Sequence, residues 1–232
     1  LNEELIPARV ALEDGLHFFD PDTGRDEFFV QPEDGRPENR GNDGKPDPAG
    51  NMWQGTMPMV QDKVGGLYRI APDGSSRCVI DGLGCANGLG WSPDGKTMYF
   101  IDTPSRAVWA FDYDEKAGEI DLNSRRTVVD FTGFAPEEGG PDGMTVDAEG
   151  KLWVAQWGGC RVCRYDEITG EKLMQVDVPA PCTTCPTFGG EKLDKLFITT
   201  AGFGKEKFPE AGSLFVADVG VCGRKANRFG RE

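Results

Sequence analysis

The feature that most constrains the fold of this chain is a turn followed by an alternating strand pattern, which recurs four times. The segments are DPAGNMWQGTM (47–57), SPDGKTMYFIDT (92–103), DAEGKLWVAQW (147–157) and, less closely, EKLDKLFITTA (191–201). Alternation of apolar and polar residues at period 2 is typical of a half-buried strand. The aromatic residues of these strands, Trp53, Tyr99, Trp153 and Phe197, recur at intervals of about 45 to 55 residues. A period in this range, with several short strands per repeat, predicts a β-propeller.

A second strand is expected after each of these, in segments 65–74, 106–118, 160–170 and 211–220, and segment 11–30 resembles the later half of one more unit. The 32 glycines and 16 prolines favour many turns over long helices. A β-sandwich is the rival fold, but it would not repeat similar turns at this period. We therefore predict one all-β propeller domain over residues 1–232, with about four and a half to five blades present.

The composition limits the kinds of molecule that this protein is expected to bind. The net charge of −14 repels phosphate backbones and attracts cations, so nucleic-acid binding is not expected and divalent metals are favoured. No apolar run approaches the roughly 20 residues that span a bilayer, so no membrane contact is predicted. The seven cysteines come without a secretion signal, and we expect reduced thiols in a cytoplasmic protein.

Three polar segments are candidates for a site: RGNDGK (40–45), CANGLGWSPDG (85–95) and GGPDGMTVDAEG (139–150). We expect them in loops before the inner strands, and stretch 40–50 is predicted to be neither strand nor helix. Asn42, Asn87 and Asp142 each precede an aromatic anchor by a similar distance, which predicts equivalent places on different blades. Their oxygens suit a hard cation such as Ca²⁺ or Mg²⁺. The alternative is that these Asn-Gly and Asp-Gly pairs only form turns with positive φ.

Two other kinds of site are weaker candidates. Cys160 and Cys163, with Cys182 and Cys185, have the spacing of a zinc ribbon, but no glycine follows either cysteine of the strand-like CRVCRYD to make a tight turn. Packing as small apolar groups is the preferred interpretation of these thiols. The single histidine, His17, is expected to be a strand residue rather than part of a catalytic triad.

Four parts of the sequence carry a family resemblance: RGNDGKPDPAGNMWQGTM, ANGLGWSPDGKTMYFIDTPSRAVWAFDYD, PDGMTVDAEGKLWVAQWGG, and TCPTFGG with FITTA and PEAGSLF. They resemble the gluconolactonase/regucalcin (senescence marker protein) family, and the resemblance runs from about residue 9 to about residue 221. This resemblance implies a six-bladed propeller with one central divalent cation that hydrolyses sugar lactones. Ca²⁺ is the first expectation, with Zn²⁺, Mg²⁺ and Mn²⁺ as alternatives. By motif, Asn87 and Asp142 match metal ligands, Asp142 also matches the catalytic base, and Arg40 and Asn42 match the substrate-binding pair.

The sequence departs from the family at its start. Family members carry a first-blade motif, GE-x-P-x-W, whose glutamate binds the metal, and nothing here matches it. Glu3 and Glu4 do not lie in such a motif, and we expect the chain to begin partway through the second blade. The activity of the 232 residues by themselves is therefore a separate question. There are two alternatives to a small-molecule lactonase: a non-catalytic calcium-binding scaffold, and an esterase for aryl esters or organophosphates. The oligomeric state is not predicted.

Overall fold

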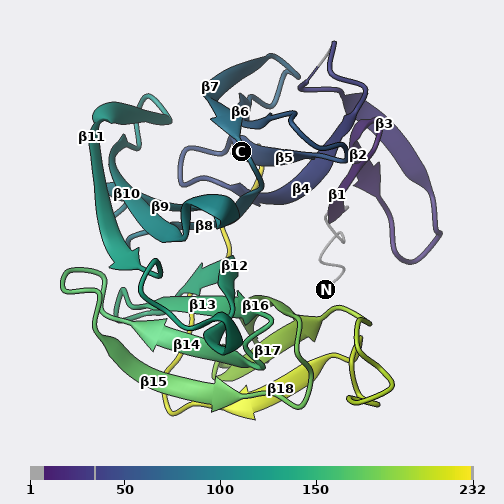
Figure 1. The fold of residues 1–232 in the computed structure, drawn as a ribbon. Coiled ribbons are helices and arrows are strands. Elements are labelled where there is room, and N and C mark those ends of the chain that lie inside the picture. Colours follow the sequence, from purple (N-terminus) through teal and green to yellow (C-terminus); the bar gives the residue numbers. More distant parts are fainter. Residues whose placement is uncertain (1–7, 34, 231–232) are drawn as a thin grey trace.

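The chain folds into five antiparallel sheets that follow one another around a common centre in chain order (Figure 1). This computed structural model describes residues 8–33 and 35–230. Glu3 and Glu4 lie outside the described residues. Each sheet is built from strands that are consecutive in the sequence, as expected of propeller blades. The all-β propeller prediction is thus confirmed, with five sheets in place.

Three sheets have four strands and two have three. The four-stranded sheets contain β4 (Asn39–Pro46), β5 (Met52–Pro58), β6 (Gly65–Ile70) and β7 (Ser76–Leu83); β8 (Ala86–Trp91), β9 (Thr97–Asp102), β10 (Ala107–Asp114) and β11 (Glu119–Asp130); and β12 (Gly140–Val146), β13 (Leu152–Trp157), β14 (Arg161–Tyr165) and β15 (Lys172–Asp177). The three-stranded sheets contain β1 (Ala8–Leu12), β2 (Gly15–Phe19) and β3 (Asp26–Val30); and β16 (Thr183–Gly189), β17 (Lys195–Thr200) and β18 (Phe215–Asp218). Two short 3₁₀ turns, η1 (Thr103–Ser105) and η2 (Pro136–Glu138), complete the described elements.

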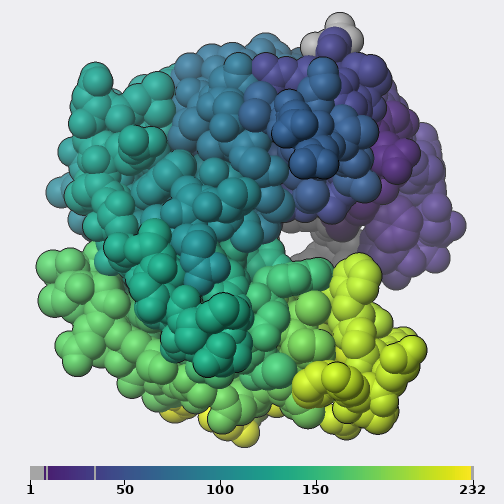
Figure 2. Space-filling view, viewed as in Figure 1, coloured from purple at the N-terminus to yellow at the C-terminus, as the bar shows by residue number. Residues whose placement is uncertain are grey.

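The first strands of four sheets, β4, β8, β12 and β16, line the centre. Each of them contacts the next one along the chain, and β1 contacts β4. The sheets at the two ends of the series flank a hollow in the space-filling view (Figure 2). The centre of the molecule is therefore built from four neighbouring strands of four different sheets.

Stretch 40–50 corrects the prediction made from its composition. Most of it belongs to β4, although it was expected to be neither strand nor helix. Segment 40–45 lies within the innermost strand β4, and segments 85–95 and 139–150 contain the innermost strands β8 and β12 with the turns that follow them, so the candidate side chains are not in loops before these strands. The polar side chains are tolerated in these strands because they face a shared cavity instead of an apolar core. The aromatic-anchor strands β5, β9 and β13 are the second strands of their sheets.

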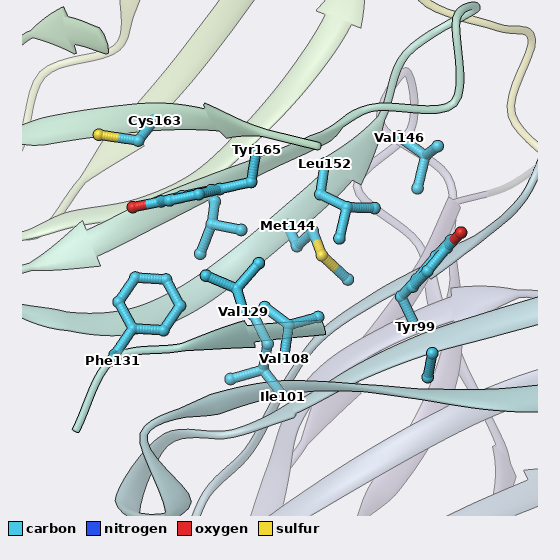
Figure 3. Close-up of a cluster of buried hydrophobic side chains, with 12 residues drawn as sticks. Tyr99, Ile101, Val108, Val129, Phe131, Met144, Val146, Leu152, Cys163 and Tyr165 are labelled. Atoms are coloured by element: carbon cyan, nitrogen blue, oxygen red, sulfur yellow. The ribbon is translucent and has the colours of Figure 1, made fainter. Parts of the chain in front are cut away.

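The apolar core lies between adjacent sheets. Figure 3 shows one cluster, in which Tyr99, Ile101 and Val108 of one sheet pack against Met144 and Leu152 of the next. Ile101, Val108, Met144 and Leu152 are fully buried. Burial of a large aliphatic side chain is worth about 1.5–3 kcal/mol, so such clusters hold neighbouring sheets together. None of the helices among residues 8–33 and 35–230 has the length and apolar character needed to cross a membrane.

The recurring turn is held by a buried carboxylate. Asp147 accepts hydrogen bonds from the backbone N–H of Lys151 (2.9 Å) and from Trp153 Nε1 (3.0 Å). Asp47 accepts the corresponding bonds from the N–H of Asn51 (2.7 Å) and from Trp53 Nε1 (2.9 Å). Each carboxylate therefore joins its turn to the aromatic anchor of the next strand. These contacts explain why the same turn sequence recurs with the period of the sheets.

The C-terminal segment crosses these turns at the opposite end of the inner strands from the candidate residues. Cys222 O accepts a hydrogen bond from the N–H of Ala148 (2.9 Å). Asn227 Nδ2 donates to Pro46 O (3.1 Å), and Phe229 packs beside Phe29 (ring centroids 5.7 Å apart). The segment thus connects turns of several sheets along one end of the molecule.

We expect the substitution Asp147→Ala to lower the free energy of unfolding by about 3–5 kcal/mol, because it leaves the buried Arg164 without its buried partner. Glu149→Ala is the matched control. Glu149 also bonds Arg164 (2.5 Å), but its side chain is 62% exposed, and a loss of about 0–1 kcal/mol is expected. Chemical denaturation monitored by tryptophan fluorescence gives both values. Equal losses for the two variants would contradict this role of the buried carboxylate.

Candidate functional site

A cavity of about 520 Å³ lies where the four inner strands meet. This volume falls within the range of about 300–1,000 Å³ that small-molecule sites occupy. Its polar lining consists of Arg40, Asn42, Asp43, Asn87, Thr103, Asp142 and Thr184. The other lining residues are Met57, Cys85, Gly143, Trp157 and Cys185. The structure therefore brings all four sequence-predicted site residues, Arg40, Asn42, Asn87 and Asp142, together in one cavity.

A β-bulge in each inner strand aims these side chains at the centre. In β4, Asn42 and Asp43 together oppose the single residue Gly55, and in β12, Asp142 and Gly143 together oppose Ala155. The register also shifts at Gly88 in β8 and at Thr184 in β16. A regular strand points adjacent side chains to opposite faces, whereas a bulge re-aims them. This is why the neighbours Asn42 and Asp43 both reach the cavity.

Glycine permits the inner strands to approach closely beside the cavity. A Cβ added to Gly143 would lie 2.6 Å from Thr184 O and 2.8 Å from Cys185 Cβ of the next strand. A Cβ on Gly88 would lie 2.8 Å from Asp142 O. Neither glycine has a positive φ. The alternative explanation of these residues as turn formers is therefore wrong, because close packing of strands is what requires glycine here.

Two carboxyl groups in the cavity lie in an unfavourable environment for charge. Burial and, second, the charge of the nearby Asp43 raise the pKa of Asp142 to about 7, although hydrogen bonds from Asn87 and from the Gly143 N–H oppose the shift. Burial also raises the pKa of Asp43. Oδ1 of Asp43 accepts the Gly44 N–H (2.8 Å), but its Oδ2 is buried without a hydrogen-bond partner among the described residues. An uncompensated buried oxygen of this kind is costly unless a further group binds it.

A lysine lies beside these carboxyls on β4. Lys45 Nζ donates to Leu89 O of β8 (2.9 Å) and to Met144 O of β12 (2.8 Å). Its charge lowers the pKa of Asp43 and so opposes the effect of burial. The ammonium group joins three inner strands and partly offsets the negative charge of the cavity.

The thiols in the cavity wall are neutral at physiological pH. Burial, with a smaller contribution from the nearby carboxylates, raises the pKa of Cys85 to about 11 and that of Cys185 to about 12. Cys85 Sγ lies 3.8 Å from Met57 Sδ. The charged groups presented by the described lining are therefore the two carboxylates and the guanidinium of Arg40.

An aromatic pair lies at the mouth of the cavity. Trp157, at the end of β13, lines the cavity and is 39% exposed. Phe203, in the segment between β17 and β18, is 64% exposed and meets it edge to face, with ring centroids 5.7 Å apart. Exposed aromatic rings beside a concave site offer a surface for a ligand. The sequence segment VAQWGG contains Trp157, but its period-2 pattern indicated only a strand.

The other candidates lie outside the cavity or are split between environments. His17 lies in β2, as expected, and contacts Asp26 (2.9 Å) and Asp14 (3.0 Å). Of the two Cys-x-x-Cys pairs, Cys163 is buried in the apolar cluster of Figure 3 and Cys185 lines the cavity. No group of three or more His, Cys, Asp or Glu residues poised to hold a metal occurs in the described part of the chain.

The cavity nevertheless fits a hard cation when amide oxygens are counted. Asp43 and Asp142 supply carboxylate oxygens, and Asn87 supplies a carboxamide. Oxygen donors of these types are the ligands that Ca²⁺ and Mg²⁺ prefer. The unpartnered Oδ2 of Asp43 and the raised pKa of Asp142 both mark a place where positive charge would relieve an electrostatic cost. Asp43 was not predicted from sequence, although it lies inside the RGNDGK segment.

The fold and the cavity define a β-propeller protein with a central, oxygen-rich cavity of a size that suits a small molecule. Residues 7–202 match the family described as SMP-30/Gluconolactonase/LRE-like region. The chain belongs to this family. The resemblance noted in the motifs is thus confirmed over most of the chain.

Known relatives agree with this assignment. Regucalcin from Homo sapiens is 43% identical over 197 residues, which cover 80% of this chain and 64% of that protein, so the match spans less than two thirds of its length. "Putative sugar lactone lactonase YvrE" from Bacillus subtilis is 37% identical over 227 residues, covering 95% of this chain and 75% of that protein. A crystal structure of a calcium-binding protein, regucalcin, from Agrobacterium tumefaciens superposes with a TM-score of 0.88 at 31% identity, covering 98% of this chain and 77% of that one.

Gly143→Ala is expected to destabilise the fold by about 1–3 kcal/mol, because the added methyl group overlaps the backbone of β16. Gly140→Ala, on the same strand, is the matched control: the nearest atom to its added Cβ is 3.9 Å away. Denaturant midpoints of the two variants test the close approach of the inner strands. A Gly143→Ala midpoint equal to that of Gly140→Ala would show that β12 and β16 do not pack as described.

Proposed function

We propose that the protein is a metal-dependent hydrolase that opens sugar lactones. The observation that carries this proposal is the convergence of Asp43, Asn87 and Asp142 with the guanidinium of Arg40 in one cavity. Membership of a family that includes a relative named as a sugar lactone lactonase supports the substrate class. The printed description of a related structure as a calcium-binding protein supports the choice of Ca²⁺, with Zn²⁺, Mg²⁺ and Mn²⁺ as alternatives.

The cation would be held by Asp142 and Asn87, with Asp43 as a further carboxylate. When bound, it supplies a Lewis acid that polarises the lactone carbonyl. Asp142 accepts a proton from the attacking water, a new C–O bond forms at the carbonyl carbon, and the ring C–O bond breaks. The protonated Asp142 then returns the proton to the departing ring oxygen. This cycle leaves the hydroxy acid and regenerates the carboxylate.

Arg40 and Asn42 bind and orient the substrate in this proposal. Arg40 Nη1 donates to Gly41 O (2.8 Å) and to Asn42 Oδ1 (3.0 Å), which holds the guanidinium at the cavity wall. Its remaining N–H groups suit the hydroxyl and ring oxygens of a lactone. Trp157 supplies an apolar face against the carbon side of the ring. We propose the cytoplasm as the compartment, where the thiols of Cys85 and Cys185 stay reduced.

Asp142→Asn should lower kcat for δ-lactone hydrolysis by at least about 10²-fold, because the amide cannot accept the proton from water. It should also weaken divalent-ion binding, measured by calorimetry. Asp112→Asn, an exposed residue on β10 far from the cavity, is the control and should behave as wild type. A panel of sugar lactones and aryl esters, with and without added Ca²⁺, Mg²⁺, Mn²⁺ or Zn²⁺, gives the rates.

The same panel separates the alternatives. A wild-type chain that binds Ca²⁺ yet hydrolyses no lactone or ester would favour a calcium-binding scaffold. Hydrolysis of aryl esters without hydrolysis of lactones would favour an esterase on the same propeller. Wild-type turnover by Asp142→Asn would overturn the assignment of the base.

A further inference from the structure

A chain of hydrogen bonds crosses the cavity wall from β4 to β12 through β8 and η1. It contains a residue, Thr103, to which the motifs assigned no role. In order, the bonds run from Arg40 Nη1 to Asn42 Oδ1 (3.0 Å), from Asn42 Nδ2 to Asn87 Oδ1 (3.2 Å), from Asn87 Nδ2 to Thr103 Oγ1 (2.9 Å), and from Thr103 Oγ1 to Pro141 O (2.8 Å). Pro141 immediately precedes Asp142, so the chain links all four of the predicted site residues.

The groups at the two ends of this hydrogen-bond chain determine which atom donates and which accepts in each of its bonds. A guanidinium can only donate, so the atom of Asn42 that faces Arg40 is its oxygen, and its nitrogen faces Asn87. Asn42 Nδ2 also donates to the carbonyl of Ala86 (2.8 Å), which can only accept and enforces the same orientation. At the other end, the carbonyl of Pro141 takes the one hydroxyl proton of Thr103. Thr103 can therefore only accept a hydrogen bond from Asn87.

Asn87 is thus oriented from both sides. Thr103 requires its nitrogen, and Asn42 requires its oxygen. The nitrogen also lies 3.5 Å from Cys85 Sγ, a weak acceptor, and donates to the carboxylate of Asp142, and both contacts agree with this assignment. A rotation of the amide by 180° would break both the 2.9 Å and the 3.2 Å bonds and would place nitrogen against nitrogen. The oxygen of Asn87 is the atom that a hard cation requires.

The position of Thr103 is itself fixed by the fold. Its backbone N–H donates to Cys85 O (3.0 Å) at the start of β8, and its carbonyl accepts the N–H of Arg106 (3.0 Å) to close η1. Pro104, the next residue, restricts the backbone further. The hydroxyl group is therefore held between β8 and β12 by backbone contacts that a change of side chain leaves intact.

We propose that Thr103 is a positioning residue that orients the Asn87 carboxamide as a ligand for a divalent cation. Its role toward the cation rests on the proposed function, whereas the orientation of the amide does not. Thr103→Val removes the hydroxyl at nearly constant volume, and Thr103→Ser retains it. These two variants isolate the hydrogen bond from the shape of the side chain.

Calorimetric titration of the full chain with Ca²⁺ tests the proposal directly. Loss of a partner that orients a metal ligand typically weakens metal binding by about 10- to 100-fold, so Thr103→Val should bind Ca²⁺ at least about 10-fold more weakly than wild type. Thr103→Ser should bind as wild type, and the melting temperatures of the two variants should show that both fold. Thr103→Val binding with wild-type affinity would overturn the proposal, as would equal weakening in both variants.

Exchange of the Asn87 side-chain amide protons, measured by NMR without added metal, separates this proposal from the proposed function. The signals are identified by their loss in Asn87→Asp. Slow exchange in wild type and Thr103→Ser, with faster exchange in Thr103→Val, supports the orientation by Thr103. Equal exchange in all three proteins would overturn it. A wild-type chain that binds no divalent ion, yet shows this exchange pattern, would overturn the proposed function and leave the hydrogen-bond chain standing.

Discussion

The structure depends on the close approach of the inner strands at the centre of the propeller. Adjacent strands β8, β12 and β16 meet at Gly88 and Gly143, where any side chain would overlap the next backbone. Bulges at the same level of each strand turn polar side chains toward the shared centre. Four strands that are distant in sequence thereby contribute to one cavity, and none of them contributes more than three lining residues. The site is therefore formed by the inner strands together, and no single sheet supplies all of its residues.

This arrangement brings two carboxyl groups together where burial disfavours their ionised forms. Burial raises the pKa of both Asp43 and Asp142, the charge of Asp43 adds to the shift of Asp142, and one oxygen of Asp43 has no partner among the described residues. Lys45 relieves part of this cost from within the protein, since its charge favours the ionised form of Asp43. A buried carboxyl pair with incomplete compensation is a common property of functional sites. A divalent cation would compensate the remainder, which is why we place it in the cavity and not elsewhere.

Much of the architecture was predictable because the turn-and-strand pattern is local. Asp47, Ser92 and Asp147 occupy the same place in three sheets, and Asn42, Asn87 and Asp142 each precede them by five residues, so the predicted equivalence of these positions is confirmed. The roles assigned to them remain predictions. The bulges were not predictable, because a period-2 pattern places Asn42 and Asp43 on opposite faces. Thr103 and Trp157 were missed for a related reason: each lies at a strand end, and its contact is with a residue of another element.

The measurement that tests this account most directly is anomalous diffraction from crystals of the chain grown with Ca²⁺, recorded at long wavelength. We predict one peak in the central cavity, within about 2.3–2.6 Å of carboxylate oxygens of Asp43 and Asp142 and of Asn87 Oδ1. The amide nitrogen of Asn87 should still face Thr103 in that structure. Full Ca²⁺ occupancy at another place on the protein, with an empty central cavity, would contradict the central claim.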